Sequence, residues 1–159
     1  MIVKTIVDED FSNYKKPSMF IASYKCSGKC EKECGMRVCQ NSTLATAPNI
    51  KISTRDIIER YLKNPLTEAI VFGGLEPFDD FDSVAWLIKV LRLNYMCDDV
   101  VVIYTGYYLE EIQDKIDILK QFKNIIIKFG RFIPNNKGKF DKVLGVRLAS
   151  DNQYAKQIS

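Results

Sequence analysis

Apolar residues occur in short runs that alternate with amphipathic segments along most of the chain. The runs are rich in the β-branched and aromatic residues that favour strands, and they cover residues 1–7, 18–24, 68–74, 99–106 and 124–130. Apolar side chains recur every three or four positions in residues 79–95 and 108–122, which predicts two helices. A capping signal, Ser53 with Asp56 three residues later, predicts a further helix that ends near Leu62.

Strands that alternate with helices predict an α/β fold with a mostly parallel sheet and right-handed crossovers. A last short strand is expected in residues 143–148, before a polar tail, and residues 133–141 are expected to form a surface loop. The chain has 159 residues, enough to bury one core, and it shows no internal repeat or long linker. We therefore expect one domain, residues 1–159.

The charge pattern points away from nucleic acids and membranes. The net charge is +3, and lysine-rich spots such as Lys15–Lys16 and Lys137–Lys139 are typical of solvated surface. No apolar run approaches the roughly 18–20 residues of a membrane span. The N-terminal residues lack the basic start and long apolar stretch of a secretory signal, so the expected location is cytoplasmic.

Four of the 5 cysteines lie close together in a chain that has no histidine: Cys26, Cys30, Cys34 and Cys39. Because disulfides are rare in the cytoplasm, such a group is typical of a metal site or of redox chemistry. Zinc sites normally use two short knuckles separated by a longer insert. Here three, three and four residues separate successive cysteines, and this spacing favours a loop wrapped around an iron–sulfur cluster. A zinc site and unused buried thiols remain the alternatives. Cys97 stands alone and is expected to have no ligand role.

Three unusual segments follow predicted strands directly. The cysteine segment follows residues 18–24, the sequence GGLEP follows a buried strand, and TGYY follows the strand at residues 99–104. In parallel α/β proteins the ligand site lies beyond the carboxyl ends of the strands. The three segments are therefore expected to meet at one end of the sheet.

Taken in order, these motifs resemble the radical S-adenosylmethionine proteins, in particular the activating proteins of anaerobic ribonucleoside-triphosphate reductases. The matching segments are Cys26-x3-Cys30, Cys39-Gln40-Asn41, Gly73-Gly74-Leu75-Glu76-Pro77, Tyr104-Thr105-Gly106-Tyr107, Gly130-Arg131-Phe132 and Ser150-Asp151-Asn152-Gln153. They extend over nearly the whole chain. The resemblance implies a shortened, open, partial barrel of the radical S-adenosylmethionine type.

The resemblance also implies that three cysteines hold a 4Fe-4S cluster and leave one iron open to S-adenosylmethionine. Cys26, Cys30 and Cys39 are the favoured ligands, because a Gln-Asn pair follows Cys39 much as an asparagine follows the third cysteine in the family. The family separates its second and third cysteines by two residues, and this chain does not. Cys34 is the alternative third ligand.

The remaining residues that the resemblance assigns to the cofactor lie in the two later segments: Gly73, Gly74, Glu76, Tyr104, Thr105 and Gly106. Leu75 is inserted into the family's Gly-Gly-Glu segment, which leaves open whether Glu76 or only the glycine backbone meets the ligand. No catalytic side chain is assigned. Lys128 and Arg131 are expected to be surface charges, with contacts to a ligand or a partner as the alternative.

The activity that the resemblance implies is that of a glycyl-radical-activating oxidoreductase. The reduced cluster cleaves S-adenosylmethionine, and the resulting 5′-deoxyadenosyl radical takes a hydrogen atom from a glycine of the anaerobic reductase. A low-potential electron donor, such as a flavodoxin-type protein, is the second implied partner. One alternative is a radical enzyme that acts on another protein or a small molecule. The other is a non-catalytic module that binds zinc or an iron–sulfur cluster.

Overall fold

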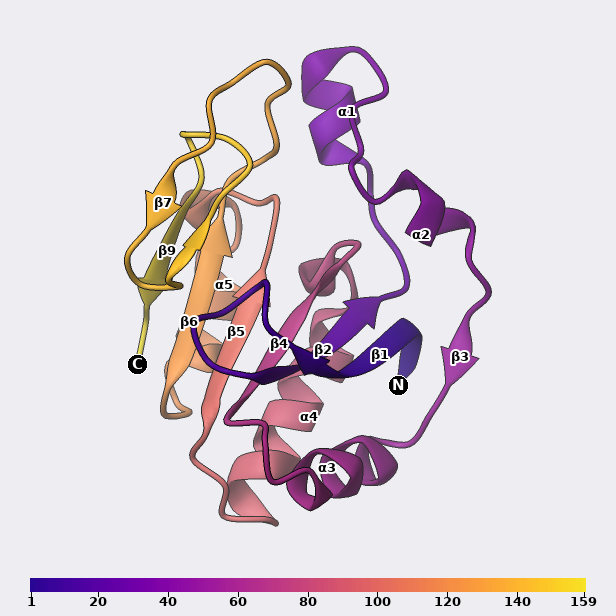
Figure 1. Ribbon diagram of the computed structural model, residues 1–159, viewed down its shortest axis with the longest axis vertical. Coiled ribbons are helices and arrows are strands. Elements are labelled where there is room, and N and C mark those ends of the chain that lie inside the picture. Colours follow the sequence, from indigo (N-terminus) through magenta and orange to yellow (C-terminus); the bar gives the residue numbers. More distant parts are fainter.

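The computed structural model describes residues 1–159, and a seven-stranded sheet forms its centre (Figure 1). The strand order is β3-β1-β2-β4-β5-β6-β9. The strands are β1 Ile2–Asp10, β2 Ser18–Ser23, β3 Ile50–Lys51, β4 Ala69–Gly74, β5 Val100–Tyr104, β6 Ile125–Phe129 and β9 Tyr154–Gln157. The central strands β2, β4, β5 and β6 are parallel, and β1, β3 and β9 pair antiparallel at the two sides. The sheet does not close, which confirms the predicted open, mostly parallel α/β architecture.

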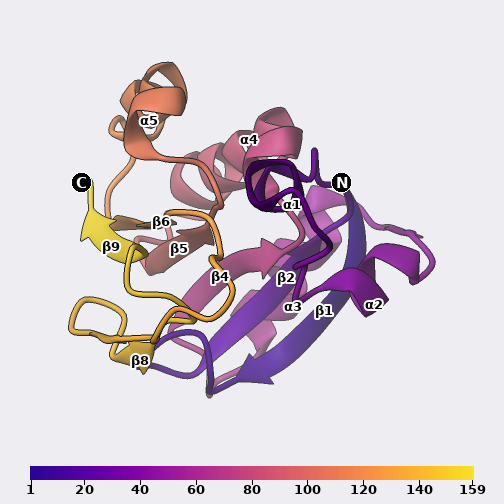
Figure 2. The ribbon, with the colours of Figure 1, turned by 90° about the horizontal axis from the view of Figure 1, so that it is seen from above.

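Three helices supply the apolar layer on one face of the sheet: α3 Thr54–Lys63, α4 Phe81–Leu93 and α5 Gln113–Leu119. Figure 2 shows α4 and α5 on the same side. In α4, Val84, Ile88 and Leu91 are almost completely buried, as the helical spacing predicts. The predicted cap of α3 is also present, because Ser53 Oγ accepts a hydrogen bond of 3.0 Å from the Asp56 N–H.

The opposite face carries a segment that we call the flap, residues 133–149. It contains a hairpin of β7 Phe140–Asp141 and β8 Val146–Arg147, which forms no part of the main sheet. Leu144 and Leu148 are buried against the sheet in a small second core. The flap is tied down further because the Lys15 N–H donates to Leu144 O at 2.7 Å.

Several predicted elements differ from the structure. The strand expected at residues 143–148 is reduced to β8, and the supposed polar tail contributes β9, whose backbone pairs with the open edge of β6. The helix expected at residues 108–122 divides into a 3-10 turn, η2 Leu109–Glu111, and the shorter α5. It divides because Ile112 leaves the helical region, with φ −135°.

The cysteines lie in a long connection between β2 and β3, with two short helices, α1 Lys29–Cys34 and α2 Ser42–Thr46. No residue from 24 to 56 is buried. This connection therefore adds nothing to the apolar core. No helix of the chain has the length and apolar character needed to cross a membrane.

Candidate functional site

A cavity of about 750 Å³ lies beyond the carboxyl ends of the parallel strands. Its walls include every residue that the sequence assigned to metal or cofactor: Cys26, Cys30, Cys39, Gly73, Gly74, Glu76, Tyr104, Thr105 and Gly106. These residues come from three separate segments of the chain, as expected from the strand ends. The volume falls within the usual range of roughly 300–1,000 Å³ for small-molecule and cofactor pockets.

The four clustered cysteines are not equivalent in this cavity. Cys26, Cys30 and Cys39 are on its wall, whereas Cys34 is not among the lining residues. No three acidic, cysteine or histidine side chains lie close enough together to hold one metal ion. Cys97 is partly buried against the main core, far along the chain from this segment. The fold thus brings three thiols to one cavity without gathering them around a single point.

The two cysteines at the start of the segment are kept in their thiol form by their surroundings. Although Cys26 as a residue is exposed, partial desolvation of its thiol raises the pKa to about 11, against a hydrogen bond from the Gly28 N–H to its sulfur at 3.3 Å. Burial also raises the pKa of Cys30, against a backbone hydrogen bond from Phe132. Because iron binds thiolates, loading of a metal here must release protons. The same N–H groups would then stabilise the bound sulfurs.

Gly73 and Gly74 permit close packing at the end of β4. A Cβ added to Gly74 would lie 2.8 Å from Leu44 Cδ2 and 2.9 Å from Ala22 Cβ, and the backbone there has φ +75°. A Cβ on Gly73 would lie 2.8 Å from the Phe20 ring. The glycines therefore bring the backbone of β4 close to its protein neighbours, and both glycines also line the cavity.

Glu76 joins the ends of two strands through its carboxylate. It accepts hydrogen bonds from the Gly106 N–H at 2.8 Å, from Thr105 Oγ1 at 2.7 Å and from the Phe78 N–H at 3.1 Å. The side chain is buried, and this burial raises its pKa to about 7, against the three hydrogen bonds. Both carboxylate oxygens are engaged by the protein, so Glu76 shapes the cavity wall from within.

Lys128 contradicts the expectation of a surface charge, because it is 7% exposed. Its ammonium donates to Thr105 O at 3.2 Å and to Gly130 O at 3.1 Å and lines the cavity. Burial lowers its pKa to about 8, against the attraction of Glu76. Two of its three N–H groups are used, which leaves one for a ligand.

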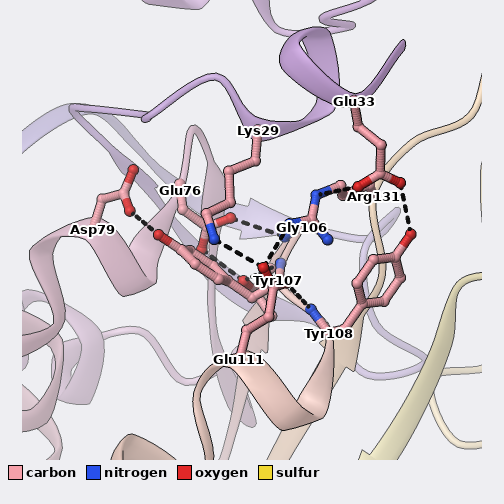
Figure 3. A network of polar contacts seen from close by, with 10 residues as sticks. Lys29, Glu33, Glu76, Asp79, Gly106, Tyr107, Tyr108, Glu111 and Arg131 are labelled. Carbon is pink, nitrogen blue, oxygen red and sulfur yellow. Dashed lines mark hydrogen bonds and ion pairs between the residues drawn. The ribbon is translucent and has the colours of Figure 1, made fainter.

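Arg131 was also expected at the surface, but only 7% of its side chain is exposed. It ion-pairs with Glu33 of α1 at 3.0 Å and with Glu111 at 2.7 Å (Figure 3). Lys29 of α1 pairs with the same Glu111 at 2.9 Å. Hydrogen bonds from Arg131 and Lys29 hold the pKa of the Glu111 carboxyl at about 2. These pairs, which we call the polar latch, fasten the cysteine helix to the loops after β5 and β6.

Comparison with known families decides the coarse identity of this site. A family model for a 4Fe-4S single cluster domain matches residues 18–154, most of the chain. The chain belongs to this family. Neither the comparison with curated proteins nor that with solved structures gives a match.

Membership of the 4Fe-4S single cluster domain family supports an iron–sulfur cluster as the cofactor of the cysteine segment. The residues present fit this group chemically, because three thiols and no histidine face the cavity. The three thiols do not lie close enough together to bind one metal ion, so cluster binding requires the cysteine segment to bring them closer.

Sequence reasoning missed several residues of this member of the family. Asn41 donates from Nδ2 to Gly74 O at 2.6 Å and so joins the cysteine segment to the glycine pair. The sequence analysis used Asn41 only to favour Cys39 as a ligand and gave it no contact of its own. The flap residues from 146 to 149 also line the cavity. Their part in the site could not be read from the sequence, because it depends on how the flap folds over the sheet.

Proposed function

We propose that this protein is a radical S-adenosylmethionine enzyme that generates a glycyl radical on an anaerobic ribonucleoside-triphosphate reductase. The carrying observation is that Cys26, Cys30 and Cys39 share a cavity with the bare backbone of Gly73 and Gly74, while Cys34 lies outside it. Three cysteine ligands leave one iron of a 4Fe-4S cluster open. Four would close the cluster and leave only electron transfer or a structural role.

When bound, the reduced cluster supplies the electron that cleaves a carbon–sulfur bond of S-adenosylmethionine, and the 5′-deoxyadenosyl radical so released takes a hydrogen atom from a glycine. The protein provides binding, orientation and shielding. Gly73 and Gly74 offer backbone without side chains at the cavity wall, so that the amino-acid part of the ligand can approach closely.

Lys128 is the natural counter-charge for the ligand carboxylate. It is a buried cation on the cavity wall, with one N–H not used by the protein. Glu76 acts indirectly: by binding the Gly106 N–H and the Thr105 hydroxyl it fixes the loop after β5 against the end of β4. Neither role requires a proton transfer during the reaction.

The test is product formation by the anaerobically reconstituted protein with dithionite and S-adenosylmethionine. We expect slow release of 5′-deoxyadenosine from the protein alone. When the reductase is added, an organic doublet should appear by electron paramagnetic resonance, and its splitting should collapse if the reductase carries glycine deuterated at Cα. Efficient turnover of a small molecule by the protein alone, with no radical on a partner, would replace this proposal by the small-molecule alternative.

A further inference from the structure

The flap carries an unbalanced positive charge beside the mouth of the cavity. Its basic residues are Lys137, Lys139, Lys142 and Arg147, and all four are exposed. None of them forms an ion pair. Other exposed lysines, such as Lys120 and Lys123, pair with nearby aspartates.

The single acidic residue of the flap does not offset this charge at the surface. Asp141 is 8% exposed, and its carboxylate turns inward. Oδ1 accepts from the N–H groups of Val143 and Leu144, and Oδ2 accepts from the Ala155 N–H at 2.9 Å. The carboxylate thus closes the turn of the hairpin, and the charged side chains on the exposed surface of the flap are all cationic.

These lysines sit on ordered backbone that continues into the cavity wall. The Leu148 N–H donates to Lys139 O at 2.7 Å, and a Cβ on Gly138 would collide with Leu148 O. Leu148 and Ala149 themselves line the cavity. The cationic surface is therefore held at the rim of the cavity.

Phe140 adds an apolar contact to the same surface, since it is 62% exposed between Lys139 and Asp141. Aromatic side chains are enriched at protein–protein interfaces, and charges around them steer a partner of opposite charge. An acidic partner surface with an apolar spot would complement it in charge and chemistry.

The position of the flap indicates which partner it faces. Figure 2 shows β8 and α1 on opposite sides of the carboxyl ends of the central strands. The cysteine helix α1 is on the other side, and its Lys29 and Glu33 are already paired in the polar latch. A protein seated on the flap thus approaches the cavity from the side away from the cysteine helix. An electron donor needs the cysteine side, whereas the protein that receives the radical needs the cavity.

We infer that the flap is the docking surface for the radical-accepting protein and that it binds an acidic segment beside the target glycine of that protein. This inference rests on the proposed function. It adds the partner's charge and the face of this chain on which the partner sits.

The test compares two triple charge reversals in the full-length, cluster-loaded protein. The first variant combines Lys137→Glu, Lys139→Glu and Lys142→Glu, none of which lines the cavity. The matched control combines Lys51→Glu, Lys63→Glu and Lys89→Glu, which are exposed residues in β3, α3 and α4. Both change the net charge equally. A milder form of the first variant, with three glutamines, guards against a folding defect.

Binding to the anaerobic reductase is measured at low and high salt, and glycyl radical formation is driven by dithionite so that no donor protein is required. We expect the flap variant to bind at least about tenfold more weakly than the control variant, with a smaller salt dependence. The affinity of the glutamine form for the reductase should lie between the affinities of the flap variant and the control variant. Release of 5′-deoxyadenosine without partner should be unchanged, which separates failure of docking from failure of the proposed function.

Three outcomes would overturn the inference. The flap and control variants could bind the reductase equally. The flap variant could lose activity only when a donor protein replaces dithionite, which would assign the flap to the donor. The wild-type protein could bind a single-stranded oligonucleotide through the flap while its affinity for the reductase does not depend on the charge of the flap. The flap would then be a nucleic-acid-binding surface.

Discussion

The two sides of the cavity are built by different means. The floor, at the ends of β4, β5 and β6, is buried, and its charged side chains Glu76 and Lys128 hydrogen-bond to the protein. The cysteine segment has no buried residue and is held by exposed or partly exposed pairs such as Lys29–Glu111. Surface ion pairs contribute only about 0–1 kcal/mol each, whereas an unpaired buried group costs about 1–3 kcal/mol. The floor is therefore formed by folding, and the cysteine side is completed by the cluster.

The largest expected effect concerns which cysteines complete the cluster. Cys39→Ala should abolish the four-iron signal, because Cys39 is on the cavity wall, while Cys34→Ala should keep most of it. Iron and sulfide per chain after anaerobic reconstitution measure this difference. Equal loss in the two variants would mean four ligands and would exclude the open iron.

The second prediction contrasts the two sides by stability. Glu76→Ala leaves the Gly106 N–H and the Thr105 hydroxyl without a partner in a buried place, and should lower the free energy of unfolding by about 1–3 kcal/mol. Glu33→Ala removes an exposed partner while Arg131 keeps its ion pair with Glu111, so this change should cost less than about 1 kcal/mol. Urea unfolding of the cluster-free chain measures both. Similar losses of unfolding free energy in the two variants would contradict the proposed difference between the floor and the cysteine side.

The third prediction uses the pH dependence of the floor. The pKa of Lys128 is about 8 in the folded chain and near its usual 10.5 when unfolded. Between these values the unfolded chain binds more protons, so the Lys128 contribution makes the unfolding free energy rise with pH, by at most about 1.4 kcal/mol per pH unit. Lys128→Met should lack this rise. The difference between wild type and variant is the quantity to measure, because the raised pKa values of Cys26 and Cys30 add a pH dependence of their own. A constant difference would contradict the burial of Lys128.

The smallest effect is expected from loosening the polar latch. Glu33→Gln weakens the tie between α1 and Arg131 and should speed amide exchange in the cysteine segment of the cluster-free protein, with little change in the floor. Loading the cluster should slow that exchange again in both proteins. If amide exchange in the cysteine segment is already as slow as in β4 and the variant does not change it, the cysteine side is not less stable than the floor.

The parts of the fold that could be predicted are those where one segment carries its own signal. The strands β4, β5 and β6 and the helix α4 could be predicted, because continuous apolar runs and apolar residues at helical spacing are strong signals of buried strands and helices. Strand β9 was not predicted, because Tyr154–Gln157 is short and mostly exposed and its hydrogen bonds depend on the open edge of β6.

The site divides in the same way. Its cysteines and glycines were found because they occur in unusual local groups. Lys128 and Arg131 were misjudged because a charge usually lies at the surface. Their burial depends on segments far away in the sequence, with Thr105 next to Lys128 and with Glu33 and Glu111 around Arg131. The choice of Cys39 over Cys34 as third ligand stays a prediction, made from the Gln-Asn pair that follows Cys39.

The most direct measurement is Mössbauer spectroscopy of the reconstituted protein with and without S-adenosylmethionine. The account predicts that one iron site of the cluster becomes distinct from the other three when the ligand is added, as its amino and carboxylate groups reach the open iron. The Cys34→Ala variant should show the same change. Four iron sites that remain unaffected by S-adenosylmethionine in a fully loaded cluster would contradict the account.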